Sequence, residues 1–464
     1  MHNSFILFCA LNAVKGMVIK MKIQLSDHFT YGRLLRFAAP SVLMMIFTSV
    51  YSVVDGFFVS NFAGKTAFAA VNLIFPFLMI VATVGFIFGT GGTAIVAKAF
   101  GEGEREHANK LFSLFVYISF FLGVLFAVLG IIYIEPISRL LGAGGALLEN
   151  CVLYGRIILL ALPFYVLQLM FQTFFVAAEK PKLGLAVTVS AGVTNMILDA
   201  VLVILLPQEH KLAGAAVATA MSQVIGGGVP LVYFARENSS ILRLGKTHFD
   251  GAAILKACTN GSSEFMSNVS MNVVGMLYNI QLLRYAGEDG VAAYGVMMYV
   301  SFIFAAAFIG YSIGTSPVIS YHFGAQNSDE LSSLLKKSIT VILWASGFMV
   351  LAGEVLSRPL SAVFVGYDRE LLELTVSGFR IFALSFLFMG IAIFGSGFFT
   401  ALNDGLTSAV ISFLRTLVFQ VAFVLILPLV WEIFGVWFSI VAAELMAAAL
   451  TVVFIKIRQK DYLY

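Results

Sequence analysis

Two aspartates and two neutral polar residues lie within long apolar stretches of this sequence. Asp55 lies in the run Val-Tyr-Ser-Val-Val-Asp-Gly, and Asp199 follows Asn195 by one helical turn, on the same helix face. An ionisable group inside a membrane span costs about 2.5 to 3.5 kcal/mol, so its presence indicates a function. With a rise of about 1.5 Å per residue, both aspartates lie about 10 Å from the surface where their spans end, and Thr219 lies about 7 to 8 Å from that surface.

If the three spans that carry these residues face one cavity, the four side chains form a single polar layer. Burial penalises the carboxylate anion, so such a pair of acids would exchange a proton or hold a bare cation. The sequence therefore predicts cation or proton coupling at Asp55, Asn195, Asp199 and Thr219. The alternative is that each aspartate only forms hydrogen bonds across helices.

The second half of the chain carries a different set of charges. Arg415 and Glu444 each lie about 13 Å into consecutive spans, near the midplane of a hydrocarbon core about 30 Å thick. Opposite charges at one depth predict a buried ion pair. A structural role for the pair is favoured over substrate contact or coupling. Glu264 lies in a polar run near the end of its span, where it lines an inner vestibule or simply sits at a solvated helix end.

Aromatic residues make up 14% of the chain, and it contains 17 methionines. Such side chains suit a pocket that adapts to flat cations through cation–π and polarizable contacts, although lipid-facing aromatics would give the same composition. The candidates for a substrate cleft are Tyr51, Phe75, Phe171, Met196, Tyr278, Tyr294 and Glu264.

The elements that must position these residues are membrane spans. The chain is 60% hydrophobic and 11% charged, against about 25% charged in ordinary soluble domains. A span needs about 20 mostly apolar residues. Twelve such stretches are predicted, at 35–62, 67–97, 111–134, 151–178, 184–206, 214–235, 253–285, 291–323, 337–356, 372–401, 406–429 and 435–457.

The distribution of basic residues predicts the orientation. An even number of spans places both termini on one side of the membrane, and that side holds about three times as many Lys and Arg as the other. Basic loops stay in the cytoplasm, so both termini are expected there.

The sequence also repeats itself. A shift of 223 positions places Ala63, Gly64, Ala69, Ala70, Ile80, Ala82, Gly91, Phe100 and Gly101 on identical residues, and a shift of 224 does the same for Arg156, Phe174, Phe175 and Ala177. We therefore expect an all-α polytopic membrane protein of two direct six-helix repeats around a central cleft, related by an axis along the membrane normal.

The predicted domains follow from this repeat. They are a cytoplasmic extension at 1–30, an N-lobe at 31–235, a cytoplasmic linker at 236–252, a C-lobe at 253–457 and a cytoplasmic tail at 458–464. The apolar run 5–14 is too short for a span and lacks a preceding basic region, so it is interpreted as a poorly ordered extension, with Met17 and Met21 as alternative starts to Met1.

Other function classes find little support. Cys9, Cys151 and Cys258 are isolated, without disulfide or metal-ligand spacing, so no structural metal and no cofactor are expected. No histidine lies deep in a span with a nucleophile at catalytic spacing, so catalytic residues and an enzyme activity are not expected. We expect no nucleic-acid partner.

These residues resemble the multidrug and toxic compound extrusion (MATE) family. The resemblance rests on the repeat, the stretch from Pro40 to Gly64 with its Val-Asp, the run Gly-Lys-Thr-Ala-Phe-Ala-Ala-Val-Asn from Gly64, and the spacing of Asn195 and Asp199. The run Lys-Ile-Gln-Leu-Ser-Asp-His-Phe-Thr from Lys22 is similar to the MepA-like bacterial branch. The resemblance implies a cation site at the four N-lobe residues and a helix bend at Pro40.

The resemblance also implies a function. It indicates a secondary active efflux transporter that exports cationic, hydrophobic drugs or metabolites by antiport with H+ or Na+, as two lobes rock around a central cleft. We expect a multi-pass monomer, surrounded by lipid, in the bacterial cytoplasmic membrane. The alternatives are a flippase for lipid-linked molecules or metabolites, which would have a more cationic cleft, and a membrane enzyme or receptor.

Overall fold

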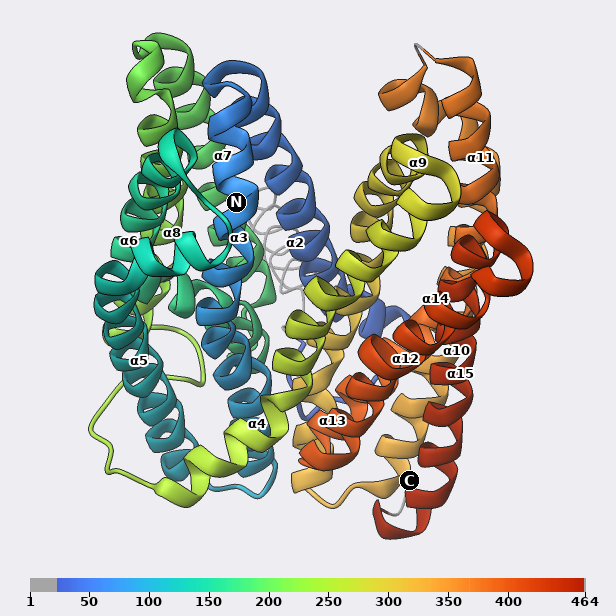
Figure 1. Cartoon of the computed structure of the whole chain (residues 1–464). Coiled ribbons are helices and arrows are strands. Elements are labelled where there is room, and N and C mark those ends of the chain that lie inside the picture. The colour runs from blue at the N-terminus through green and yellow to red at the C-terminus, as the bar shows by residue number, and fades with distance from the viewer. Residues whose placement is uncertain (1–22, 367, 463–464) are drawn as a thin grey trace, which may run out of the picture.

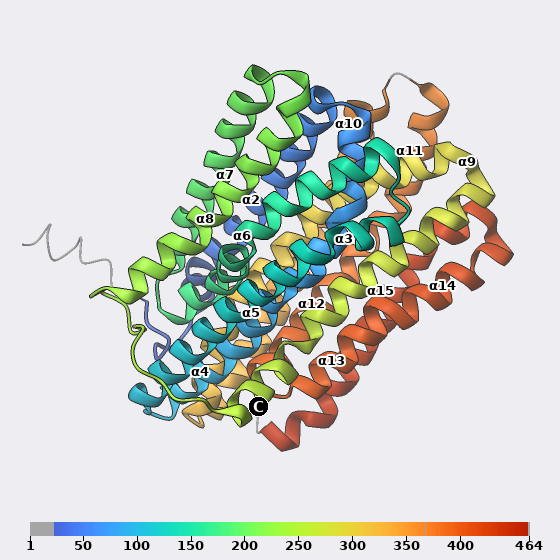
Figure 2. The same cartoon turned by 60° about the vertical axis from the view of Figure 1, so that its left-hand side comes forward.

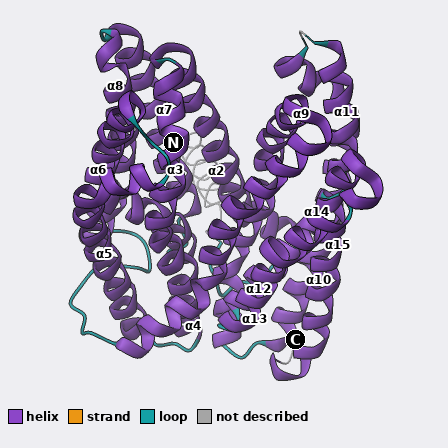
Figure 3. Ribbon diagram, in the orientation of Figure 1, coloured by secondary structure: helices purple, strands orange, loops and turns teal. Residues whose placement is uncertain are grey.

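The computed structural model describes residues 23–366 and 368–462, and every regular element in that part of the chain is helical (Figures 1 and 3). Residues 1–22 of the predicted N-terminal extension, with Cys9, lie outside the described residues.

The first half of the chain forms the N-lobe. Its elements are α2 (Tyr31–Phe58), η1 (Val59–Ala63), α3 (Lys65–Phe86), η2 (Ile87–Gly91), α4 (Gly92–Gly101), α5 (Arg105–Leu140), α6 (Gly145–Ala177), α7 (Pro181–Leu205), η3 (Gln208–His210) and α8 (Lys211–Ala235).

The second half forms the C-lobe. Its elements are α9 (Gly251–Gly324), α10 (Ser328–Val365), α11 (Arg369–Ala383), α12 (Phe386–Ala401), α13 (Gly405–Phe413), η4 (Leu414–Phe419), α14 (Gln420–Ile426) and α15 (Pro428–Tyr462). The segments η1, η2 and η4 are short π-helical turns that continue a span.

The twelve predicted spans are present in this set. Among the described residues, 10 helices are long and apolar enough to cross a membrane, and α11 with α12 forms a further span that bends by 47°. The continuous helix α9 has 74 residues and is interrupted at Gly287 (φ 62°, ψ −151°), so it contains two spans. The break between α11 and α12 was not predicted from the sequence, which indicated a single span at 372–401.

Polar residues begin several of these helices. The side chains of Thr30, Asp250, Asn327 and Asp404 each accept a hydrogen bond from a backbone N–H in the first turn of the following helix. Such caps satisfy donors that a helix start leaves without a partner, and they fix where each span begins.

The backbone repeats between the lobes as the sequence does. Six of the nine left-handed residues in the described part of the chain form three pairs: Gly64 (φ 96°) with Gly287 (φ 62°), Gly103 (φ 84°) with Gln326 (φ 53°), and Glu179 (φ 57°) with Asn403 (φ 58°). The first two pairs are 223 positions apart and the third is 224 apart, the same shifts that align the sequence. These three turns between spans are therefore duplicated with the helices.

The lobes meet through a reciprocal contact of two glycines. A Cβ at Gly101 would lie 2.0 Å from Tyr321 O, and a Cβ at Gly324 would lie 2.1 Å from Lys98 O. Each glycine and each carbonyl lies 223 positions from its counterpart, as expected for a contact across a two-fold axis. We call this end of the molecule, where α4 and α9 finish and α5 and α10 begin, the basic end.

Further interlobe contacts lie on the same side of the molecule. A Cβ at Gly91 would lie 2.1 Å from Ala257 O, and one at Gly310 would lie 2.6 Å from the Cα of Val42. The opposite end, which holds the turns at Gly64 and Gly287, is called the far end. The ribbons of the two lobes approach each other at the basic end and diverge toward the far end (Figure 1). Residues 236–250 run along the basic end from α8 to α9 (Figure 2).

Replacing Gly324 by Ala should destabilise the protein by about 1 to 3 kcal/mol, because the new Cβ meets a backbone carbonyl and the helices must separate. Thermal unfolding in detergent measures this as a lower Tm. Gly295 is the matched control on α9, since a Cβ there meets nothing within 4 Å. Equal Tm values for Gly324→Ala and Gly295→Ala would contradict the close interlobe packing.

Candidate functional site

The structure brings the four predicted N-lobe residues together. Asp55 lies on α2, Asn195 and Asp199 lie on α7, and Thr219 lies on α8. The Asn195 amide donates to Thr219 Oγ1 at 3.4 Å, and the Thr219 hydroxyl donates to Asp55 Oδ1 at 3.4 Å. The side chains of Asp55 and Asp199 also lie within interaction distance of each other. Three helices therefore converge on one polar cluster.

A glycine on α7 allows α2 to approach closely enough for this. A Cβ at Gly192 would lie 2.5 Å from the ring of Phe47 and 3.0 Å from the ring of Tyr51. Both rings lie on α2, Phe47 about two turns and Tyr51 about one turn before Asp55, and Gly192 lies about two turns before Asp199 on α7. The small residue thus sets the helix spacing at which the two carboxyl groups meet.

The acids are buried without a basic partner. Asp199 is fully buried, and Asp55 is half-buried. Among the described residues, neither carboxylate oxygen of Asp199 has a hydrogen-bond donor, and neither Asp55 nor Asp199 forms a salt bridge. Two adjacent carboxylate anions repel each other, and burial adds a desolvation cost. One proton between the two groups, or one cation bound by both, would remove this cost.

Sequence reasoning missed part of the surroundings. Tyr154 of α6 is buried and lies near Asp55, Asp199 and Thr219. Gln168, also on α6, lies beside the Tyr51 hydroxyl. The signal was available, since an amide in an otherwise apolar span is costly in the same way as a charge.

The C-lobe holds its charges in another arrangement. Arg415 Nε donates to Glu444 Oε1 at 3.1 Å and to Glu444 Oε2 at 2.9 Å. The side chains of this pair are 17% and 3% exposed. Glu264 is half-buried and close enough to Arg415 to interact with its charge. The Arg415 guanidinium therefore interacts with two carboxylates, those of Glu444 and Glu264.

The C-lobe has no acid at the position equivalent to Asp55. Tyr278 stands there, and its hydroxyl donates to Gln420 Oε1 at 2.9 Å. Its ring stacks on Tyr294 with a centroid distance of 5.1 Å. Both tyrosines are buried inside the lobe, so the expectation that they line a substrate cleft does not hold in this structure.

The other residues predicted to line the cleft differ in their exposure. Phe171 is 1% exposed and stacks on Phe234 at 5.5 Å, within the aromatic core of the N-lobe, so it does not line a cleft in this structure. Phe75 is 52% exposed on α3, and Met196 and Tyr51 are half-buried. The burial of Phe171 follows from close packing of rings, which composition does not reveal.

The predicted bend at Pro40 is not present as a break. The helix α2 continues from Tyr31 to Phe58 with Pro40 inside it. Proline has no backbone N–H, so the helix lacks one hydrogen bond at this point and is weakened there. The helix is intact in this conformation but has a local site at which it can bend.

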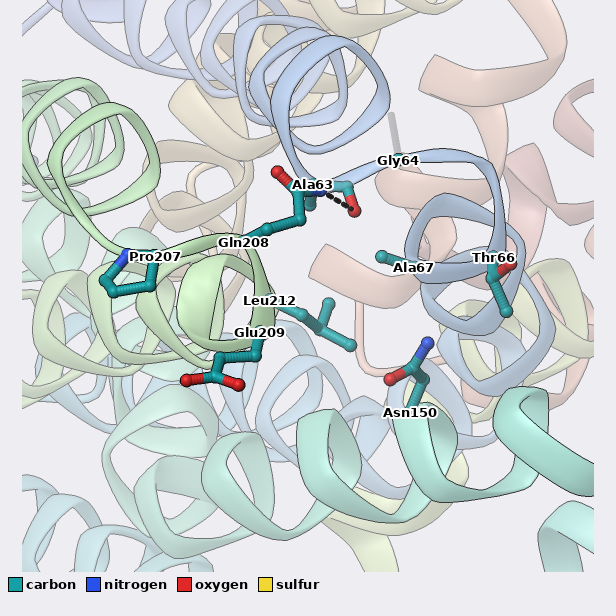
Figure 4. A pocket seen from close by; sticks show the side chains of 9 residues that line it. All are labelled: Ala63, Gly64, Thr66, Ala67, Asn150, Pro207, Gln208, Glu209 and Leu212. Carbon is teal, nitrogen blue, oxygen red and sulfur yellow. Dashed lines mark hydrogen bonds between the residues drawn. The ribbon is translucent and has the colours of Figure 1, made fainter.

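A pocket of about 630 Å³ opens on the N-lobe at the far end (Figure 4). Its lining includes Gly64, Asn150 and Gln208, and the Gln208 amide donates to Ala63 O at 3.2 Å. Asp55 and Asp199 do not line it. Within residues 23–366 and 368–462, no group of three or more His, Cys, Asp or Glu could hold a metal ion.

Known proteins share this sequence pattern and fold. A multidrug export protein MepA from Staphylococcus haemolyticus is 25% identical over 423 residues, which cover 90% of this chain and 92% of the relative. A solved structure described as MATE in complex with MaL6 superposes with a TM-score of 0.88 at 20% identity, covering 94% of this chain and 98% of the other.

A second solved structure is described as an outward-facing conformation of a multidrug resistance MATE family transporter of the MOP superfamily. It gives a TM-score of 0.87 at 21% identity and covers 92% of this chain and 96% of that protein. The MatE family model matches residues 40–201 and 265–426, one segment in each lobe. With more than half of its length matched, the chain belongs to the MatE family, whose members are membrane transporters.

Proposed function

We propose that this protein is a secondary active exporter of cationic, hydrophobic compounds, driven by antiport of H+ or Na+ at the N-lobe acid site. The observation that carries the proposal is the pair formed by the fully buried Asp199 and the half-buried Asp55, which interact with each other and have no basic partner among the described residues. Two adjacent carboxyl groups in such a site are far more stable with one bound positive charge than with none. A coupling site requires this preference.

The proposed mechanism uses the position of Asp55 on α2. A proton or sodium ion that enters from the far end neutralises the pair and removes the repulsion between α2 and α7. Asp55 can then move relative to Asp199 and Thr219, and α2 can bend at Pro40, where one helical hydrogen bond is missing. This movement displaces the substrate toward the far end.

The charges favour a cationic substrate. Arg415 is neutralised by Glu444, which leaves Glu264 as an acidic group in the C-lobe, and the N-lobe site is acidic as well. A flippase for lipid-linked anions would need the opposite balance. The relatives named as multidrug export proteins support a range of drug-like substrates.

The basic end is proposed to face the cytoplasm of a bacterium. Short loops rich in Lys and Arg remain on that side, and α2 begins and α15 ends there. Both termini are then cytoplasmic, and the N-lobe (31–235) and C-lobe (253–457) each fold as one unit of a monomer joined by the linker 236–252.

Replacing Asp55 or Asp199 by Asn should lower drug efflux by at least about tenfold, which corresponds to 1.4 kcal/mol of lost coupling. The amide keeps the shape of the side chain but cannot release a proton or bind a cation through a negative charge. Ethidium efflux from cells at matched expression measures the effect.

Asp289→Asn is the control for this experiment, because Asp289 is exposed in the turn at the far end. Its efflux should equal that of the parent. Full efflux in both Asp55→Asn and Asp199→Asn would rule out the proposed coupling site. Loss of efflux in Asp289→Asn as well would show a general effect of removing negative charge.

Replacing Glu444 by Gln should destabilise the protein by about 1.5 to 3 kcal/mol, because it removes the carboxylate that accepts two hydrogen bonds from Arg415 Nε and leaves only the charge of Glu264 nearby. The double variant Arg415→Met with Glu444→Met should recover most of this loss. Tm in detergent measures stability, and efflux per folded molecule measures function. A double variant that is stable but inactive would show that the pair contributes to transport and is not only structural.

A further inference from the structure

We propose that residues 23–30, here called the N-terminal strap, form a releasable latch that ties the two lobes together at the basic end. The strap precedes α2 and contacts both lobes. Its backbone N–H at Leu25 donates to Glu179 Oε1 at 3.0 Å, in the turn between α6 and α7 of the N-lobe. Three residues later the same strap binds the C-lobe.

The C-lobe contact is centred on one carboxylate. Glu330, in the first turn of α10, accepts a hydrogen bond from Phe29 N at Oε1, at 2.8 Å. Its Oε2 lies 2.6 Å from His28 Nδ1. Lys337, two turns further along α10, donates to Phe29 O. The Glu330 side chain is 8% exposed, so the strap supplies hydrogen-bond donors that a buried carboxylate needs.

Two apolar side chains of the strap are as buried as residues of a protein core. Phe29 is fully buried and Leu25 is 1% exposed. The Phe29 ring meets His322 of α9 edge-on at 6.5 Å and Phe37 of α2 at 5.8 Å. One ring therefore contacts helices of both lobes, and separation of the lobes at the basic end must expose it.

The linker makes the equivalent contact with the roles of the lobes exchanged, since it precedes the C-lobe and binds the N-lobe. Residues 241–247, here called the linker strap, precede α9 and bind α5 of the N-lobe. Arg243 N donates to Asn109 Oδ1 at 2.7 Å, Gly245 N donates to Ser113 Oγ at 3.0 Å, and Thr247 Oγ1 donates to Lys110 O at 2.7 Å. α5 and α10 are the third spans of their lobes, so each strap joins the first span of one lobe to the third span of the other.

The two straps differ in whether they can detach when the lobes separate. The linker strap is a covalent connection between the lobes, so it remains whether or not its hydrogen bonds persist. The N-terminal strap continues into α2, and its hold on the C-lobe depends on non-covalent contacts at His28, Phe29 and Glu330. It is therefore the strap that can release, and its release frees the start of the helix that carries Asp55.

The proposal rests on the two lobes separating at the basic end during transport, as in the proposed function. Its test is a distance measurement without substrate, so it does not depend on which drug or ion is carried. Spin labels on Lys182→Cys of α7 and Lys456→Cys of α15 report the separation, in a background with Cys9→Ser, Cys151→Ala and Cys258→Ser. Both label sites are exposed and lie on different lobes.

Glu330→Ala should increase the ratio of open to closed distances by about tenfold or more, the factor expected for losing a hydrogen bond to a charged group. Asp329→Ala is the matched control, because it removes a neighbouring exposed carboxylate from the same helical turn. Asp329→Ala loses the same interaction with the helix dipole as Glu330→Ala but keeps the contact between Glu330 and the strap, so the distances should stay unchanged in this control.

A second pair of variants keeps the test decisive if Glu330→Ala folds poorly. Lys337→Gln removes the donor to Phe29 O, whereas Lys336→Gln removes an exposed neighbour of the same charge. Lys337→Gln should shift the distances in the same direction and Lys336→Gln should not. Unchanged distances in both Glu330→Ala and Lys337→Gln, or equal shifts in the variants and their controls, overturn the proposal. A shift without any drug efflux would support the latch and contradict the transport function.

Discussion

The structure depends on the cost of holding two carboxyl groups together inside a low-dielectric bundle. Asp55 and Asp199 meet because Gly192 lets α2 and α7 approach, and they share the cluster with Asn195 and Thr219. Without a basic partner, the pair is stable only with a positive charge between the two groups. The occupancy of this site by a proton or cation would therefore change the force between two helices, which is the physical basis of the coupling that we propose.

The two lobes share a duplicated backbone but differ in the polar residues that they carry. The left-handed turns at Gly64 and Gly287 and the reciprocal contact of Gly101 and Gly324 show that the lobes share one backbone plan. At the position equivalent to Asp55, however, the C-lobe has Tyr278 hydrogen-bonded to Gln420. This neutral pair needs no ion to be stable, unlike the two acids of the N-lobe, which is why we place the proposed coupling site in the N-lobe.

The sequence predicted the fold and the acid site for identifiable reasons. Twelve apolar stretches are long enough to be unambiguous, and the depth of Asp55, Asp199 and Thr219 along their spans follows directly from helical rise. The position of Phe171 was not predictable, because an aromatic residue in a span looks the same whether it packs inside a lobe or faces a cleft. The break between α11 and α12 had no proline or glycine signal at Leu384 and Ser385. The straps were missed because their contacts join residues far apart in the sequence, 301 positions for Phe29 and Glu330 and 134 positions for Arg243 and Asn109.

The most direct test of coupling at the N-lobe acids is drug accumulation in proteoliposomes with proton and sodium gradients imposed separately. We predict that one of the two gradients drives accumulation by the parent protein, and that the same gradient drives none in the variant carrying both Asp55→Asn and Asp199→Asn. Gradient-driven accumulation by the double variant at the rate of the parent would contradict the account, because the coupling ion would then bind elsewhere.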